Sequence, residues 1–166
     1  MSAAIMQAAQ ADMPFVPPAA MHRAEQDLPF VEIMTGVRVQ VVHADIKAAI
    51  WVTRMKADPG VTLTRHKHTG EVFAFTLSGA WKYLEYPELN TKGSYLYEPP
   101  GSIHTLQVLE SNTEVTDVWF AIRGANLYLA DNDRIDAMAD ATGALERYLD
   151  AVRAAGFPIP NVITSI

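Results

Sequence analysis

The sequence predicts an all-β fold, a barrel or sandwich of short strands, followed by one C-terminal α-helix. Between about residues 31 and 129, short runs rich in Val, Ile, Thr, Tyr, Phe and Trp alternate with Gly and Pro. This pattern is typical of strands joined by tight turns. Nearer the C-terminus, the apolar residues recur with the period of a helix instead. We expect one domain, because 166 residues suffice to bury a single core.

Eight short strands are expected within this β region. Their approximate ranges are residues 36 to 43, 47 to 56, 61 to 68, 71 to 78, 80 to 86, 93 to 98, 103 to 109 and 114 to 122. Turn-forming sequences such as Asp58-Pro59-Gly60 and Pro99-Pro100-Gly101 separate them. So many short strands in about 100 residues favour a sandwich or a barrel.

The two ends of the chain are expected to flank the β region. Residues 1–30 contain four of the ten prolines, which predicts an irregular N-terminal arm. A helix is expected over about residues 143 to 155, because apolar residues occur at i, i+3, i+4 and i+7 at Leu145, Tyr148, Leu149 and Val152. Its other face carries the charged residues Glu146, Arg147, Asp150 and Arg153. The expected organisation is an arm over 1–30, a β-barrel over 31–130, and a helix and tail over 131–166 that pack on the barrel or a partner subunit.

Composition excludes several classes of function. The formal net charge is -6, from 13 basic and 19 acidic residues, so no basic surface is expected for nucleic acid or anionic lipid. Cysteine is absent, which excludes thiolate chemistry, disulfides and cysteine-ligated metals. Neither a signal peptide nor a membrane span is apparent, so we expect a cytoplasmic protein.

Three histidines are expected to form a metal site. In His66-Lys67-His68 the two imidazoles are at i and i+2 of a strand, and alternate residues of a strand point to the same face. His104 follows the turn Pro99-Pro100-Gly101 at the start of another strand, and this turn can deliver it across the barrel. Imidazole is a common ligand of transition metals. We therefore predict one divalent transition-metal ion bound by His66, His68 and His104.

The spacing around these histidines resembles the two motifs of the cupin superfamily. Gly60, five residues, His66-Lys67-His68 and then Gly79 resemble the first motif. Gly93, five residues, and the run from Pro99 to His104 resemble the second. The resemblance implies a cupin barrel, which is a double-stranded β-helix or jelly roll, with the N-terminal arm and the C-terminal α-helix added to it.

One position departs from the cupin pattern. A ligating glutamate usually occupies the place of residue 72, where this chain has Val72. Glu71 is adjacent, but an offset of one residue turns a strand side chain to the opposite face unless a bulge intervenes. We therefore predict a three-histidine site that this carboxylate does not complete. Such a site leaves the ion its full charge and about three open positions for substrate and dioxygen.

A longer run, from His66 to Val108, resembles the cupin dioxygenases typified by 2,4′-dihydroxyacetophenone dioxygenase. The similar segments are H-K-H-T-G, T-L-S-G-A-W-K-Y-L-E and G-S-Y-L-Y-E-P-P-G-S-I-H-T. The resemblance implies non-haem Fe(II) that cleaves a carbon–carbon bond of a small hydroxyketone or dicarbonyl with O2, giving carboxylic acids. The chain also resembles, less closely, the zinc-binding cupin domain of certain anti-sigma factors. A zinc-binding sensor without turnover and a metal-dependent isomerase or lyase are therefore alternatives, and Zn, Ni or Mn could replace iron.

The reaction would need a general base and a substrate pocket. Glu98 is the first candidate base, because the cupin pattern places an inward apolar residue at its position, and Glu85 is the weaker candidate. Trp51, Tyr83 and Leu106 are candidate pocket residues, since aromatic and aliphatic side chains line such pockets. The expected partners are a small-molecule substrate and O2, and the family resemblance implies a homodimer.

Overall fold

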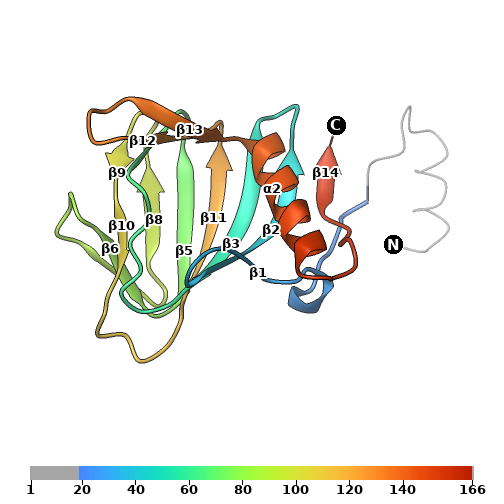
Figure 1. Cartoon of the computed structure of the whole chain (residues 1–166), viewed down its shortest axis with the longest axis horizontal. Coiled ribbons are helices and arrows are strands. Elements are labelled where there is room, and N and C mark those ends of the chain that lie inside the picture. Colours follow the sequence, from blue (N-terminus) through green and yellow to red (C-terminus); the bar gives the residue numbers. More distant parts are fainter. Residues whose placement is uncertain (1–18, 166) are drawn as a thin grey trace, which may run out of the picture.

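The computed structural model describes residues 19–165, so most of the predicted N-terminal arm lies outside the described residues. The strands form three sheets that pack as a jelly roll (Figure 1), which confirms the predicted all-β class. The largest sheet has the order β1-β2-β3-β11-β5-β8, and β14 pairs in parallel with β2. Its strands are β1 (Val31–Met34), β2 (Val37–Asp45), β3 (Ile50–Ala57), β5 (Val72–Ser78), β8 (Tyr95–Glu98), β11 (Thr116–Arg123) and β14 (Ile163–Ser165).

Two smaller sheets complete the jelly roll. One has the order β10-β6-β7, and the other has the order β13-β12-β4-β9 and carries the three histidines. Their strands are β4 (His66–His68), β6 (Ala80–Tyr83), β7 (Leu89–Thr91), β9 (Ile103–His104), β10 (Leu106–Val108), β12 (Asn126–Leu129) and β13 (Ile135–Ala139). A short 3-10 helix, η1 (Glu25–Asp27), precedes β1.

Several expected strands differ in extent from those observed. The strand expected over residues 61 to 68 is reduced to β4, preceded by an isolated bridge between Thr62 and Gln107. The strand expected over 103 to 109 is divided into β9 and β10, because Thr105 donates its backbone N–H to the Glu85 carboxylate over 2.8 Å rather than to a neighbouring strand. Five strands were not predicted: β1, β7, β12, β13 and β14. Short or exposed strands such as these lack the alternating apolar pattern on which strand prediction depends.

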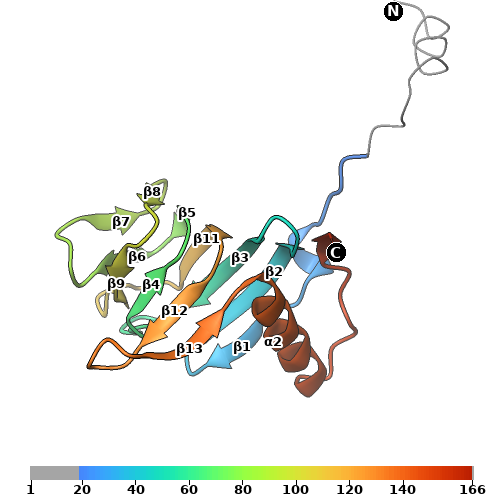
Figure 2. The same ribbon diagram turned by 90° about the horizontal axis from the view of Figure 1, so that it is seen from above.

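The predicted C-terminal helix is confirmed as α2 (Ala141–Ala154). It begins at Asp140, whose carboxylate accepts a hydrogen bond of 2.8 Å from the backbone N–H of Gly143. Tyr148 and Val152 are buried beneath it, and the Tyr148 hydroxyl donates to the Pro29 carbonyl over 2.8 Å. Figure 2 shows α2 beside β1, β2 and β13, at one end of the large sheet. The helix therefore closes one side of the jelly roll.

Two polar features stabilise the large sheet. Arg54 on β3 forms a two-pronged pair with Asp117 on β11, with Nε–Oδ1 and Nη2–Oδ2 distances of 2.8 and 2.6 Å, and both side chains are largely buried. Gly79, between β5 and β6, has a φ of 71°, and a Cβ there would lie 2.7 Å from the Thr116 Cα. This close approach of two backbones explains why the turn requires glycine.

The outer face of the large sheet exposes aromatic side chains. Phe73 and Phe75 on β5 are 42% and 46% exposed, and their register partners Tyr97 and Tyr95 on β8 are 50% and 63% exposed. The inward residues of the same strands, such as Val72 and Ala74, are buried. These four aromatic side chains therefore point away from the inward face of the sheet, and Tyr97 also lines a separate pocket beside Glu98 and His104. No helix within the described residues is long and apolar enough to cross a membrane.

Candidate metal centre

Strand pairing brings the three predicted ligands together. His66 and His68 lie on β4 with Lys67 between them, and His66 is the register partner of His104 on β9. All three histidines are buried, and their possible ligand atoms lie within 4.8 Å of one another. The ring centroids are 4.8 to 4.9 Å apart in every pair. The cluster could therefore hold one metal ion.

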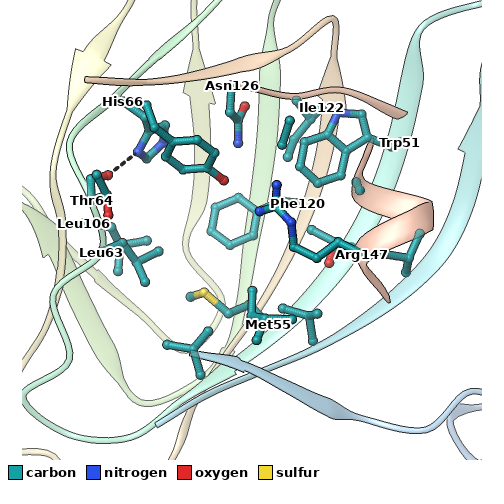
Figure 3. A pocket seen from close by; sticks show the side chains of 18 of the residues that line it. Trp51, Met55, Leu63, Thr64, His66, Leu106, Phe120, Ile122, Asn126 and Arg147 are labelled. Atoms are coloured by element: carbon teal, nitrogen blue, oxygen red, sulfur yellow. Dashed lines mark hydrogen bonds between the residues drawn. The ribbon is translucent and has the colours of Figure 1, made fainter. Parts of the chain in front are cut away.

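A backbone contact orients the ring of His66 (Figure 3). Its Nδ1 lies 2.9 Å from the carbonyl oxygen of Thr64, so Nδ1 carries the proton and Nε2 retains its lone pair. Burial lowers the pKa of His66 to about 4, so the ring is neutral at pH 7. A neutral imidazole with a free Nε2 is the form that binds metals.

A carboxylate also enters the cluster. Glu98 is 3% exposed, and its Oε2 lies 2.8 Å from the Nε2 of His68 and 3.1 Å from the Nε2 of His104. The two Nε2 atoms are themselves 3.0 Å apart. Burial acts to raise the pKa of Glu98, but the two imidazoles outweigh it and hold that pKa well below its ordinary value. Glu98 is therefore ionised at neutral pH.

The strand register explains how Glu98 reaches this position. Val72, which occupies the usual place of the cupin glutamate, is buried on β5 directly opposite Glu98 on β8. Opposed residues of an antiparallel pair share one face of the sheet. The carboxylate therefore comes from the adjacent strand, at the same level of the sheet. Glu71 points elsewhere, since its carboxylate lies 3.0 Å from the Nε of Arg123.

Tyr83 supports both Glu98 and His104. Its hydroxyl donates a 2.5 Å hydrogen bond to the Glu98 Oε1, and its ring stacks on the His104 ring with a centroid separation of 3.7 Å. Burial, and then the negative charge of Glu98, raise the pKa of Tyr83 well above its ordinary value. The phenol therefore keeps its proton and acts as the donor.

The distances among His68, His104 and Glu98 fit a shared metal ion. Two donors bound about 2.1 Å from one ion are about 3.0 Å apart at a right angle and about 3.4 Å apart at the tetrahedral angle. The observed separations are 3.0, 2.8 and 3.1 Å. The Glu98 Oε2 is buried and has no properly oriented hydrogen-bond donor among the described residues. These three separations therefore match those of ligands that share one ion, and they also lie within the range of hydrogen bonds.

An apolar cavity of about 170 Å³ adjoins the cluster (Figure 3). Its lining includes His66, His68, Glu98 and the three predicted pocket residues, Trp51, Tyr83 and Leu106. The remaining wall is largely aliphatic and aromatic, with side chains such as Val39, Met55, Leu63, Phe120 and Ile122. The chain therefore places a small, mostly apolar chamber directly against the possible metal ligands.

Glu85, the weaker candidate base, lies outside this cavity. Strand β6 ends at Tyr83, so the alternation expected to turn Glu85 inward stops before it. Its exposed carboxylate instead accepts hydrogen bonds of 2.8 and 2.9 Å from the backbone N–H and hydroxyl of Thr105. Both carboxylate oxygens are hydrogen-bonded to Thr105, and Glu85 is not among the residues that line the cavity.

Two polar residues of the cavity were missed by sequence reasoning. Asn126 on β12 is the register partner of His68, and its buried Oδ1 has no hydrogen-bond partner among the described residues. Arg147 on α2 is exposed, as expected for the charged side of the helix, and it also lines the cavity. Neither belongs to a recognisable motif, so only the pairing of β12 with β4 and the seating of α2 reveal them.

Comparison with known proteins supports the cupin fold. The family model described as the ChrR cupin-like domain matches residues 19–121. A cupin-fold protein of unknown function from Ralstonia eutropha JMP134 is 29% identical, with coverage of 92% of this chain and 96% of that one and a TM-score of 0.83. An RmlC-like cupin from the same organism is 28% identical, with coverage of 86% and 92% and a TM-score of 0.78.

A more distant structure is an acetylacetone dioxygenase from Acinetobacter johnsonii. It is 15% identical, with coverage of 84% of this chain and 97% of that one and a TM-score of 0.69. At this identity the likeness shows the fold alone. No curated protein matches the sequence significantly. Together with the family match, these structures confirm the predicted cupin fold.

Proposed function

This chain belongs to the family of ChrR cupin-like domains, and from that premise we propose that it is a metal-dependent dioxygenase. His66, His68, His104 and Glu98 hold one divalent transition-metal ion, Fe(II) in the active enzyme. The substrate is a small hydroxyketone or dicarbonyl whose carbon–carbon bond is cleaved with O2. The observation that carries the proposal is the set of closely spaced, buried imidazole and carboxylate donor atoms beside an apolar cavity.

The donor set would suit a catalytic divalent metal. Imidazole and carboxylate are ligands that Fe(II), Mn(II), Ni(II) and Zn(II) all accept. The reaction with dioxygen that we propose needs a redox-active metal, and it therefore favours Fe(II) over Zn(II).

Glu98 serves this site as a ligand rather than as the general base expected from the sequence. Its Oε1 accepts the Tyr83 hydrogen bond of 2.5 Å, and its Oε2 faces His68 and His104. Both oxygens are engaged, and the lowered pKa keeps the carboxylate from retaining a proton. Tyr83 holds this carboxylate and the His104 ring in place, which orients two of the four ligands.

The cavity positions a substrate against the ligands. A bound Fe(II) ion would supply Lewis acidity and one-electron chemistry toward dioxygen. The side-chain amide of Asn126, the register partner of His68, lines the cavity and would donate a hydrogen bond to an oxygen of a hydroxyketone, which orients the substrate. The apolar wall excludes water from the reacting carbons. Cleavage between the carbonyl and carbinol carbons of an aryl hydroxyketone takes up one O2 and yields an arylcarboxylic acid and formic acid, which balances all atoms.

The fold likeness to an acetylacetone dioxygenase supports a dicarbonyl as the second substrate class. The test combines metal analysis of untagged protein purified anaerobically with oxygen consumption after addition of Fe(II) and either 2,4′-dihydroxyacetophenone or acetylacetone. We expect about one iron per chain. Oxygen uptake should be lost in His104→Ala and kept in the matched control His43→Ala, on β2.

Other results would favour the alternatives. Stoichiometric zinc without oxygen uptake on either substrate would indicate a zinc-binding sensor or ligand-binding module. Conversion of substrate in the absence of oxygen would indicate an isomerase or lyase. Protein that binds no divalent metal at all would refute the proposal.

The same protein is proposed to be a homodimer. The exposed aromatic face formed by Phe73, Phe75, Tyr95 and Tyr97 supports this, because large apolar patches on soluble proteins commonly mark interfaces. Light scattering should give twice the mass of one chain, and Phe75→Glu should return the protein to the monomer mass. A monomer mass for the unaltered protein would refute the dimer.

A further inference from the structure

Arg147 faces the cavity from the C-terminal helix. Ala144, Arg147 and Tyr148 occupy positions i, i+3 and i+4 of α2, and all three line the cavity. Figure 3 shows Arg147 extending from the helix toward Phe120, on the opposite side of the cavity from His66. Arg147 is exposed as a residue and lines the cavity, so this residue lies where the cavity meets solvent.

The guanidinium of Arg147 has no partner within residues 19–165. Each of the other seven arginines donates to a carboxylate or to a backbone carbonyl. Arg153, on the outer side of the same helix, pairs with Asp150 over 2.6 Å. An unpaired arginine at the edge of an apolar cavity offers a planar set of donors that matches a carboxylate.

The chemistry of the cavity limits what this partner can be. Apart from the histidines, Arg147 is the one basic residue of the lining, and Glu98 is the one acidic residue. The volume of about 170 Å³ is close to that of engineered apolar cavities, about 150 Å³, that bind benzene. The space between the two polar ends therefore suits one aromatic ring or a compact aliphatic group.

We propose that Arg147 binds a carboxylate on the substrate, at the end opposite the group that the histidine cluster holds. This inference rests on the proposed function and specifies its substrate class. The substrate is then a compact hydroxyketone or dicarbonyl that also bears a carboxylate. The apolar walls contact its middle, and the planar guanidinium binds the carboxylate through two parallel hydrogen bonds.

The test compares two ligands that differ only by a carboxylate. They are 2-hydroxyacetophenone and 4-(hydroxyacetyl)benzoate, whose para carboxylate lies farthest from the hydroxyketone. Calorimetric titration without oxygen measures both dissociation constants, with and without added Fe(II), so the readout does not depend on turnover. We expect the carboxylated ligand to bind the unaltered protein about tenfold more tightly, and this advantage to decrease with salt.

Variants at Arg147 should change the ratio of the two dissociation constants, that of the neutral ligand divided by that of the carboxylated ligand. In Arg147→Met the ratio should fall to about one, because the methionine retains most of the apolar stem and removes the cation. Arg147→Lys should keep part of the preference, since lysine supplies the charge without the planar two-bond geometry. The matched control Arg153→Met, on the outer side of α2, should leave the ratio unchanged.

Each outcome separates this inference from the proposed function. A carboxylate preference that disappears in Arg147→Met supports the inference even if iron and oxygen uptake are absent. Equal binding of the two ligands, a preference that survives Arg147→Met, or binding of neither ligand overturns it. Oxygen uptake with neutral hydroxyketones together with equal binding would leave the dioxygenase proposal standing without the carboxylate subsite.

Discussion

Replacing Tyr83 with phenylalanine isolates one hydrogen bond of the candidate site. The hydroxyl donates to the Glu98 Oε1 over 2.5 Å, and the two side chains are 4% and 3% exposed. Phenylalanine keeps the ring that stacks on His104 at a centroid distance of 3.7 Å. The substitution therefore removes the donor, and it leaves a buried carboxylate oxygen without its partner.

The expected cost follows from these distances and burials. A hydrogen bond to a charged group contributes about 1.5–3 kcal/mol. We expect Tyr83→Phe to lower the free energy of unfolding of the metal-free protein by about 2 kcal/mol, and its Tm by about 4–8 °C for a chain of this length. Chelator-treated protein and differential scanning calorimetry provide the measurement, with Tyr86→Phe as the exposed control.

A double-mutant cycle tests the physical reason. In a Glu98→Gln background the Tyr83 hydroxyl faces a neutral amide, so removing it should cost only about 1 kcal/mol. The cost of Tyr83→Phe in the unaltered background minus its cost in the Glu98→Gln background, about 1 kcal/mol, measures the contribution of the carboxylate charge. A cost below about 0.5 kcal/mol in the unaltered background, or an equal cost in both backgrounds, would refute the reasoning.

Three further predictions concern stability and pH. Arg54→Met leaves Asp117 largely buried without its bidentate partner. It should lower the free energy of unfolding, measured by urea denaturation, by about 3–5 kcal/mol. A loss under about 1 kcal/mol would show that the pair does not stabilise the sheet. Gly79→Ala should lower the free energy of unfolding by about 3 kcal/mol, because the strain of a positive φ adds to the overlap with the backbone of Thr116. Gly93→Ala should lower it by about 1 kcal/mol, because Gly93 has a φ of 88° but open space around it. Equal losses would contradict the steric argument. Burial raises the pKa of Tyr148 to about 12 from about 10 in the unfolded chain, so its stabilising contribution is complete below pH 10 and is lost as pH rises from 10 to 12. In Tyr148→Phe the loss of unfolding free energy between pH 10 and 12 should be smaller by about 2 kcal/mol than in the unaltered protein. The same pH dependence in both proteins would argue against the raised pKa.

Local spacing was sufficient to predict the histidines of the site. The i, i+2 spacing of His66 and His68 places two imidazoles on one face of any strand, whatever the strand packs against. Glycine and proline spacing resembled a known pair of motifs, which supplied His104 and the fold. The helical period of residues 145 to 152 likewise predicted α2, because the periodicity of a helix is a property of the chain alone.

Other features of the site depended on contacts between distant segments. The departure at Val72 indicated that the usual cupin carboxylate does not complete the site, and Glu98 was expected to point inward as a base. The register of β5 against β8 shows that Glu98 lies opposite Val72, at the same level of the sheet. Glu85, the weaker candidate base, is exposed because β6 ends two residues before it. Strand ends and registers are decided by tertiary pairing rather than by local propensity.

The sequence by itself thus determined the fold class, the C-terminal helix and the three imidazoles, since each follows from the spacing of neighbouring residues. Only the tertiary structure decided that the Glu98 Oε2 faces the Nε2 atoms of both His68 and His104, that Asn126 lies beside His68, and that Arg147 faces the cavity. The physical reason is that a side chain's direction in a strand or helix is set locally, whereas what it meets there depends on how separate elements pack.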